Sequence, residues 1–425
     1  MAPLSPLDWF RGGTRSTCRS ALSVQASLET AVREVAVQLR GGGYADLALV
    51  FVSNNFASDL PRLLPLLQEQ LKSRHWLGCS GGGVIGTTAT GEAHELEQKT
   101  ALSVTLFSLP GVRLQPFAVD TGNLPDLDGP AQQWQQWMGI DPSDCRSLLL
   151  LIDPTSRSVS DLISGLDYAF PGATTLGGIA APHNAPHGSL LVNDRVVSGA
   201  AGISIGGDWA MEAVVAQGCR PIGPVFAIEQ ASKNILLELS HGDHRDNPVA
   251  CLQRVLSSLS DEERELVRHS LFLGIERRKI VLPGTGEECP PAAFLVRNLI
   301  GVDPGSGAVA VADRIRTGQN VQFQLREAEA SRREANQLLN LALKQDNAPP
   351  PVFALLLACL GRGSGLYGSP DGDVSIARAL QDDLLIAGVF CNGEIGPIAG
   401  ATHLHGYTAC WGLLRYLPIP HQPRL

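Results

Sequence analysis

Two stretches decide the fold: Leu47-Ala-Leu-Val-Phe-Val52 and Trp76-Leu-Gly-Cys-Ser-Gly-Gly-Gly-Val-Ile-Gly86. The first is a continuous apolar run, which is typical of a strand buried on both faces. Residues 59–72 have a helical pattern, and a helix is the usual crossover between two parallel strands. The region therefore predicts a unit of strand, helix and glycine turn.

The same unit occurs twice more along the chain. Each copy has an apolar run, a helical stretch and a second apolar run that ends in glycine. The second copy comprises Leu148-Leu-Leu-Leu-Ile152, residues 158–170 and Thr175-Leu-Gly-Gly-Ile179, and the third comprises residues 352–360, residues 373–380 and Ile386-Ala-Gly-Val-Phe-Cys-Asn-Gly-Glu-Ile-Gly-Pro397. We therefore expect an α/β protein built around repeated strand-helix-glycine-turn units.

Short alternating runs between these units predict antiparallel strands, so the sheets should be mixed. Residues 101–119 and 190–197 each resemble a hairpin, and residues 202–205 and 210–215 should extend the sheet of the second hairpin. Residues 294–301, 308–312 and 320–325 should form a further sheet, and residues 326–344 a helix.

A chain of 425 residues exceeds what one hydrophobic core usually supports, so we expect two α/β domains. Turn residues and a polar, histidine-rich stretch between Gly218 and Pro248 interrupt the pattern. The boundary is accordingly predicted near residue 220, with domains at 20–220 and 221–425.

Composition excludes several classes of protein. The formal charge is −9, with 33 Lys and Arg against 42 Asp and Glu, which makes nucleic acid a poor partner. The longest apolar run is too short to span a membrane, so we expect no membrane partner and a cytoplasmic protein. Nine scattered cysteines without a CxxC pair predict reduced thiols rather than disulfides.

The glycine turns also carry a family resemblance. Gly78-Cys-Ser-Gly-Gly-Gly-Val-Ile-Gly86, the 101–112 segment, Gly218-Cys-Arg-Pro-Ile-Gly-Pro224 and Phe390-Cys-Asn-Gly-Glu-Ile-Gly-Pro397 together resemble the FIST family. The likeness covers about residues 20–412 and both the N-terminal and C-terminal FIST domains. It implies a sensory protein that binds a small molecule, such as an amino acid, and signals through a separate protein.

The positions that match the family motif are candidate ligand-binding residues: Gly78, Cys79, Ser80, Gly81 and Gly82 in the first turn and Cys391, Asn392, Gly393 and Glu394 in the last. Successive glycines after a strand expose backbone N–H groups that can hold a carboxylate, although they can equally form a tight turn packed under a helix.

Three charged residues complete the candidate site. Glu394 either holds a ligand cation, lies in solvent or pairs with an arginine. Arg297 interrupts an apolar strand and Arg362 follows one, so each either contacts the ligand or forms a structural ion pair.

Two alternatives to a sensor stay open. Cys79 or Cys391 with a nearby histidine could perform thiol chemistry on a small amide or ester, although cysteine at a buried strand end is also ordinary core. The second alternative is an interaction scaffold without a ligand. Histidine spacings such as His403-x-His405 occur by chance in loops, so we predict neither a metal nor a cofactor, and the ligand's identity stays open.

Overall fold

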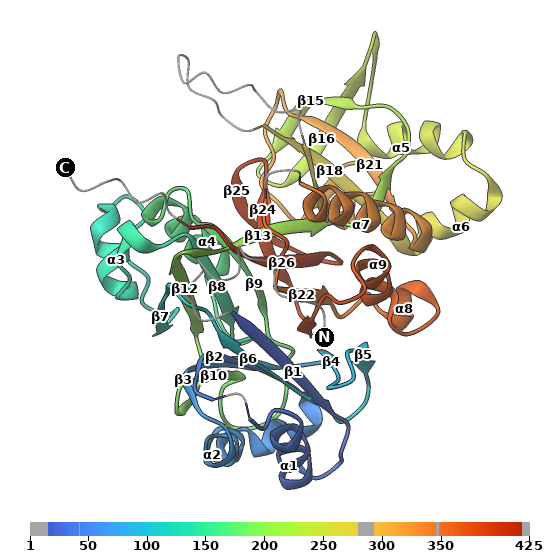
Figure 1. Ribbon diagram of the computed structural model, residues 1–425. Helices are drawn as coiled ribbons and strands as arrows, with labels where there is room; N and C mark the ends of the chain where they lie inside the picture. The colour runs from blue at the N-terminus through green and yellow to red at the C-terminus, as the bar shows by residue number, and fades with distance from the viewer. Residues whose placement is uncertain (1–15, 42, 279–292, 346–347, 419–425) are drawn as a thin grey trace.

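The computed structural model describes residues 16–41, 43–278, 293–345 and 348–418 (Figure 1). It is an α/β protein with mixed sheets, as predicted. Cys289, one of the nine cysteines, lies outside the described residues. The other cysteines are free thiols, which confirms that prediction for the described part of the chain.

The first unit contains eight elements. They are β1 (Thr17–Ser23), α1 (Leu28–Gln38), β2 (Ala45–Ser53), α2 (Leu60–Gln70), β3 (Ser73–Gly81), β4 (Gly83–Thr87), β5 (Ala93–Glu97) and β6 (Leu102–Ser108). Strands β2 and β3 are parallel neighbours, with the α2 crossover between them.

The second unit has the same order of elements. They are β7 (Val112–Val119), α3 (Ala131–Met138), β8 (Ser147–Ile152), α4 (Val159–Ala169), β9 (Thr174–Ile179), β10 (Leu190–Val192), β11 (Arg195–Val197) and β12 (Ala200–Gly207). Again the first two core strands, β8 and β9, are parallel.

The third unit repeats this order around a long insertion. It comprises β13 (Trp209–Ala216), then after the insertion α7 (Ala328–Leu343), β22 (Phe353–Cys359), α8 (Ser364–Tyr367), α9 (Gly372–Leu380), β23 (Ile386–Cys391), β24 (Glu394–Ile398), β25 (Ala401–His405) and β26 (Ala409–Tyr416). Strands β22 and β23 are parallel. The three repeated units predicted from the apolar runs are therefore confirmed.

The units exchange hairpins in a ring. The three sheets have the orders β1-β6-β2-β3-β10-β11, β7-β12-β8-β9-β24-β25 and β13-β26-β22-β23-β4-β5. Each sheet thus takes four strands from one unit and ends in a hairpin from another. This exchange ties the first half of the chain to the second through backbone hydrogen bonds.

The three sheets form the body of the protein around one central apolar core. Phe51, Leu151 and Leu357, which lie in β2, β8 and β22, all belong to this core. The outer faces of the sheets are covered by α1 with α2, α3 with α4, and α7 with α9, which lie on the outside of the body in Figure 1. Burial on both faces explains why these strands are continuous apolar runs.

Glycine is required at one repeated position. Gly78, Gly177 and Gly388 take the same register against their parallel neighbours. A Cβ atom on these glycines would lie 1.8, 1.9 and 1.8 Å from a carbonyl oxygen of the neighbouring strand. The glycines on which the three copies align in the sequence therefore allow close packing of two strands.

The insertion in the third unit folds as a separate β-barrel. It contains β14 (Cys219–Pro221), β15 (Phe226–Ser232), β16 (Ile235–His241), β17 (His244–Asp246), α5 (Pro248–Ser257), α6 (Asp261–Ser270), β18 (Leu271–Arg277), β19 (Ala293–Val302), β20 (Val309–Val311) and β21 (Asn320–Arg326). Because β18 pairs with both β19 and β21, the order β21-β15-β16-β20-β19-β18 closes on itself around its own core. The sheet predicted from residues 294–325 and the helix over 326–344 are confirmed.

Two predicted strand pairings are wrong. Residues 101–119 do not form a hairpin, because β6 and β7 belong to different sheets. Similarly, β12 and β13 do not extend the sheet of the 190–197 hairpin, which joins β3 instead. Alternating apolar residues predict a strand but not its partner, and here the partner comes from another unit. The proposed boundary at residue 220 stays a prediction.

Candidate functional site

A cavity of about 710 Å³ lies where the barrel meets the body. Its walls come from the start of α4, from β25 with the turn after it, and from β18, β19 and the residues after β20 in the barrel. These segments are far apart in the sequence, and only the tertiary fold brings them together.

The barrel wall carries three arginines around one aspartate. Arg277 Nη2 and Arg297 Nε donate to Asp313 Oδ2 at 3.1 and 2.8 Å. Arg297 Nη1 also donates to the Leu404 carbonyl oxygen at 2.9 Å, so this side chain joins the barrel to the body. Burial lowers the pKa of Arg297, and the bond to Asp313 opposes that shift. Arg314 is exposed and has no ion-pair partner among the described residues.

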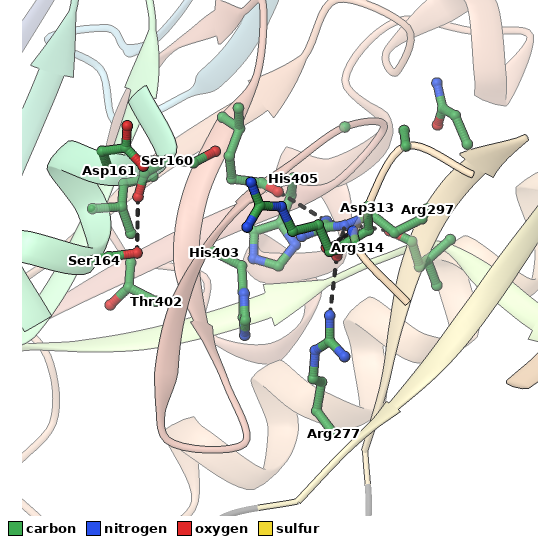
Figure 2. A pocket seen from close by; sticks show the side chains of 16 residues that line it. Ser160, Asp161, Ser164, Arg277, Arg297, Asp313, Arg314, Thr402, His403 and His405 are labelled. Carbon is green, nitrogen blue, oxygen red and sulfur yellow. Dashed lines mark hydrogen bonds and ion pairs between the residues drawn. The ribbon is translucent and has the colours of Figure 1, made fainter. Parts of the chain in front are cut away.

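The opposite wall is the first part of α4. Ser160, Asp161 and Ser164 line the cavity there, and the Ser164 hydroxyl donates to the Ser160 carbonyl oxygen at 2.9 Å. Figure 2 shows these residues facing the group of Arg277, Arg297, Asp313 and Arg314, with His403 and His405 between the two walls. The cavity therefore presents groups of both charges from opposite sides.

The two histidines are neutral at physiological pH. Burial, with Arg297 and Arg277 nearby, lowers the pKa of His403 to about 4. Burial lowers the pKa of His405 to about 3, although a hydrogen bond to Gly396 opposes the shift. The charged groups of the lining are then three arginines and two aspartates, which leaves an excess of positive charge.

The two predicted glycine turns lie together at another place, where the ends of the parallel strands meet. Gly82 N–H donates to the Phe390 carbonyl at 3.2 Å, and Asn392 N–H donates to the Ile179 carbonyl at 2.8 Å. These bonds link all three units. Gly82 and Asn392 are exposed, whereas Gly78, Ser80, Gly81 and Gly393 are buried. Of the predicted site residues, only Arg297 lines the cavity.

The thiols of the two turns lie in the central core. Cys79 and Cys391 are 1% and 0% exposed. Burial raises the pKa of Cys79 to about 12 and that of Cys391 well above its usual range. Because the thiolate is the nucleophile, both groups are unreactive in this state at neutral pH.

Glu394 is completely buried beside these turns. Its Oε2 accepts a hydrogen bond from Thr408 N–H at 3.1 Å, while Oε1 has no partner among the described residues. Burial raises the pKa of this carboxyl well above its usual range, which favours its uncharged form. Neither of the arginines considered from the sequence bonds to it.

Arg362 forms a buried ion pair away from the cavity. Its guanidinium donates to Asp373 and to the Tyr367 hydroxyl. The structural ion pair anticipated as one outcome for Arg362 is therefore present. A role of this residue, or of the glycine turns, in binding a ligand stays a prediction.

Comparison with known proteins identifies the family. Residues 46–242 match the FIST N domain model, and residues 248–397 match the FIST C domain model. The chain belongs to the FIST family.

Two mycobacterial proteins illustrate the similarity across the whole FIST chain. The uncharacterized protein Rv0628c of Mycobacterium tuberculosis (strain ATCC 25618 / H37Rv) is 32% identical over 404 residues, covering 92% of this chain and 98% of its own. The uncharacterized protein Mb0898c of Mycobacterium bovis is 32% identical over 397 residues, covering 90% and 95%. FIST domains are sensory domains for small ligands, which agrees with a ligand-binding role.

The described part of this FIST protein contains no helix that is long and apolar enough to cross a membrane. The sequence motifs of the family did not identify Asp161, Asp313, Arg314, His403 or His405 as site residues. Asp161, Asp313 and Arg314 lie near the end of a helix or strand, and no sequence spacing distinguishes them from other charged residues. The one available signal was the spacing of His403 and His405, which are two residues apart. In a strand this spacing puts both side chains on one face.

Proposed function

We propose that this FIST protein is a sensor that binds an amino acid or a related small carboxylate in the cavity between α4, β25 and the barrel. The observation that supports this site is Arg314, an arginine without an ion-pair partner among the described residues, at a cavity with an excess of positive charge. The volume of about 710 Å³ is within the range of small-molecule sites.

The two walls suit the two ends of an amino acid. A carboxylate fits Arg314, because a guanidinium offers paired N–H donors to a planar anion. An ammonium group fits Asp161 on the opposite wall, at the start of α4. The chain as a whole carries a charge of −9, so this local positive charge favours the carboxylate end of a ligand at this place over the rest of the surface.

The position of the cavity provides a route to a signal. Arg297 connects the barrel to β25 through the Leu404 carbonyl, so a ligand that contacts both walls favours one placement of the barrel on the body. We infer that a separate signalling protein recognises this placement. Its identity is an open part of the proposal.

Titration calorimetry with L-amino acids and monocarboxylates tests the site. We expect at least one compound to bind and Arg314→Gln to weaken it at least about tenfold, a loss of about 1.4 kcal/mol. The matched control is Arg316→Gln, an exposed arginine two residues away that does not line the cavity. Absence of binding across the panel, or equal affinity of Arg314→Gln and wild type, would contradict the proposal.

A further inference from the structure

His403 and His405 line the cavity, and each has a buried ring nitrogen without a hydrogen-bond partner among the described residues. Both lie on β25 two residues apart, which places their side chains on the same face of the strand. Their ring centroids are 6.2 Å apart. Both line the cavity, and Figure 2 shows the two rings side by side.

The hydrogen bonds of His405 determine which of its nitrogens carries the proton. Nε2 lies 2.9 Å from the Gly396 carbonyl oxygen. Since a carbonyl only accepts, Nε2 is the donor, and Nδ1 of the neutral ring has a free lone pair. His405 is 4% exposed, and its Nδ1 is buried without a partner among the described residues.

His403 has the complementary arrangement. Its Nε2 is buried without a hydrogen-bond partner among the described residues, and in the tautomer that carries the proton on Nδ1 this nitrogen is a free acceptor. A buried acceptor without a hydrogen bond is unfavourable, and a ligand that donates to it recovers that free energy.

The charges near the pair favour a neutral donor. Arg297 and Arg277 act on His403, and Arg297 binds the carbonyl of Leu404, which lies between the two histidines in the sequence. Burial is the main cause of the low pKa of both rings, and the nearby arginines add a positive potential that also disfavours a ligand cation beside them. A primary carboxamide is neutral, and its NH2 group offers two hydrogens, one for each ring.

We propose that His403 and His405 recognise a primary carboxamide, so that the ligand is a small amino acid with a carboxamide side chain rather than the corresponding acid. This inference rests on the proposed function, because it assigns the side chain of the ligand to a third wall of the same cavity. In this arrangement Arg314 holds the carboxylate, Asp161 the ammonium group and the histidines the amide NH2. The carboxylate of an acidic side chain has no hydrogen to donate. Its oxygens would face the lone pairs of the two histidine nitrogens.

The test compares L-glutamine with L-glutamate, and L-asparagine with L-aspartate, by titration calorimetry at neutral pH. We expect the wild type to bind one amide at least about tenfold more tightly than its acid. His405→Phe should remove that preference by weakening amide binding. Because His405 is buried, His403→Phe, at a half-buried position, is a second variant with the same expected result.

The outcomes separate this inference from the proposed function. Equal or tighter binding of the acids by the wild type would overturn the carboxamide assignment and leave the amino acid site standing. An unchanged preference for the amide in the folded His403→Phe and His405→Phe proteins would also overturn the carboxamide assignment. Arg314→Gln is the matched control, because it should weaken amide and acid alike. Failure of all four compounds to bind would overturn both proposals.

Discussion

Arg362 and Asp373 form an ion pair in which both side chains are 0% exposed, with Nε to Oδ2 at 2.8 Å and Nη2 to Oδ1 at 2.6 Å. The Tyr367 hydroxyl lies 2.6 Å from Arg362 Nη2 and donates to Asp373 Oδ1 at 2.8 Å. Removing one partner from such a pair leaves a buried charge without compensation. The pair therefore holds the segment between β22 and α9 in place.

We expect Asp373→Asn to reduce the free energy of unfolding by about 3 to 5 kcal/mol, because the Arg362 charge stays buried. Urea unfolding of the purified variant measures this. Glu329→Gln is the control, since Glu329 and Arg333 form an exposed pair at 3.7 Å that should contribute less than about 1 kcal/mol. Equal losses of unfolding free energy in the two variants would show that the buried pair contributes no more to stability than the exposed pair.

Glu394→Gln should be nearly neutral for stability, because burial favours the uncharged carboxyl and the amide oxygen can still accept from Thr408 N–H. Glu394→Ala should cost about 1 to 3 kcal/mol more, because that N–H then lacks a partner. Thermal unfolding compares the two variants. The same Glu394→Gln protein tests the sequence-based prediction of a ligand cation at this residue, which requires at least a thirtyfold loss of affinity, about 2 kcal/mol.

Glu95 should make the stability of the protein decrease as pH rises. Its Oε1 accepts from Val374 N–H at 2.7 Å, and burial, with Asp373 nearby, raises its pKa to about 8. In the unfolded chain the group titrates near its ordinary value of about 4.3. Between these two values the folded state holds a proton that the unfolded state has released, so the stability that Glu95 contributes is fully present below about pH 4.3 and is lost as pH rises toward 8.

Glu95→Gln removes this titration while keeping the acceptor for Val374. We expect the wild type to lose stability relative to the variant between pH 5 and pH 8.5, measured by urea unfolding at both values. The exposed Glu92→Gln is the control and should follow the wild type. Parallel pH profiles for wild type and Glu95→Gln would refute the assignment of a buried, protonated Glu95.

Gly388→Ala should prevent folding or cost at least about 4 kcal/mol, because its Cβ would lie 1.8 Å from the Leu356 carbonyl oxygen in the middle of a sheet. Gly78→Ala should behave in the same way against Val50. Gly365→Ala is the control, since no atom lies within 4 Å of its added Cβ. Soluble yield and unfolding free energy measure the effect, and a well-folded Gly388→Ala protein would contradict the close-packing explanation.

The three units were predictable because their signals are local. An apolar run such as Leu148–Ile152, the helix after it and a glycine such as Gly177 all lie within about thirty residues, and burial on both faces of a sheet leaves a continuous apolar run in the sequence. The family resemblance depends on the same local segments. Arg297 was predictable as a charged residue that interrupts an apolar run, although its partner Asp313 was not.

The sequence by itself thus determined the α/β class, the three repeats with their crossover helices, the helix α7 and three strands of the barrel, β19, β20 and β21. Only the tertiary structure decided which strands pair, because hairpins such as β4–β5 and β24–β25 add to sheets of other units through backbone hydrogen bonds that carry no residue-specific signal. It also decided the cavity, whose walls come from residues 160–164, 277, 296–298, 312–314 and 402–406. Polar side chains at element ends have no periodicity, so their convergence depends on how the barrel packs on the body.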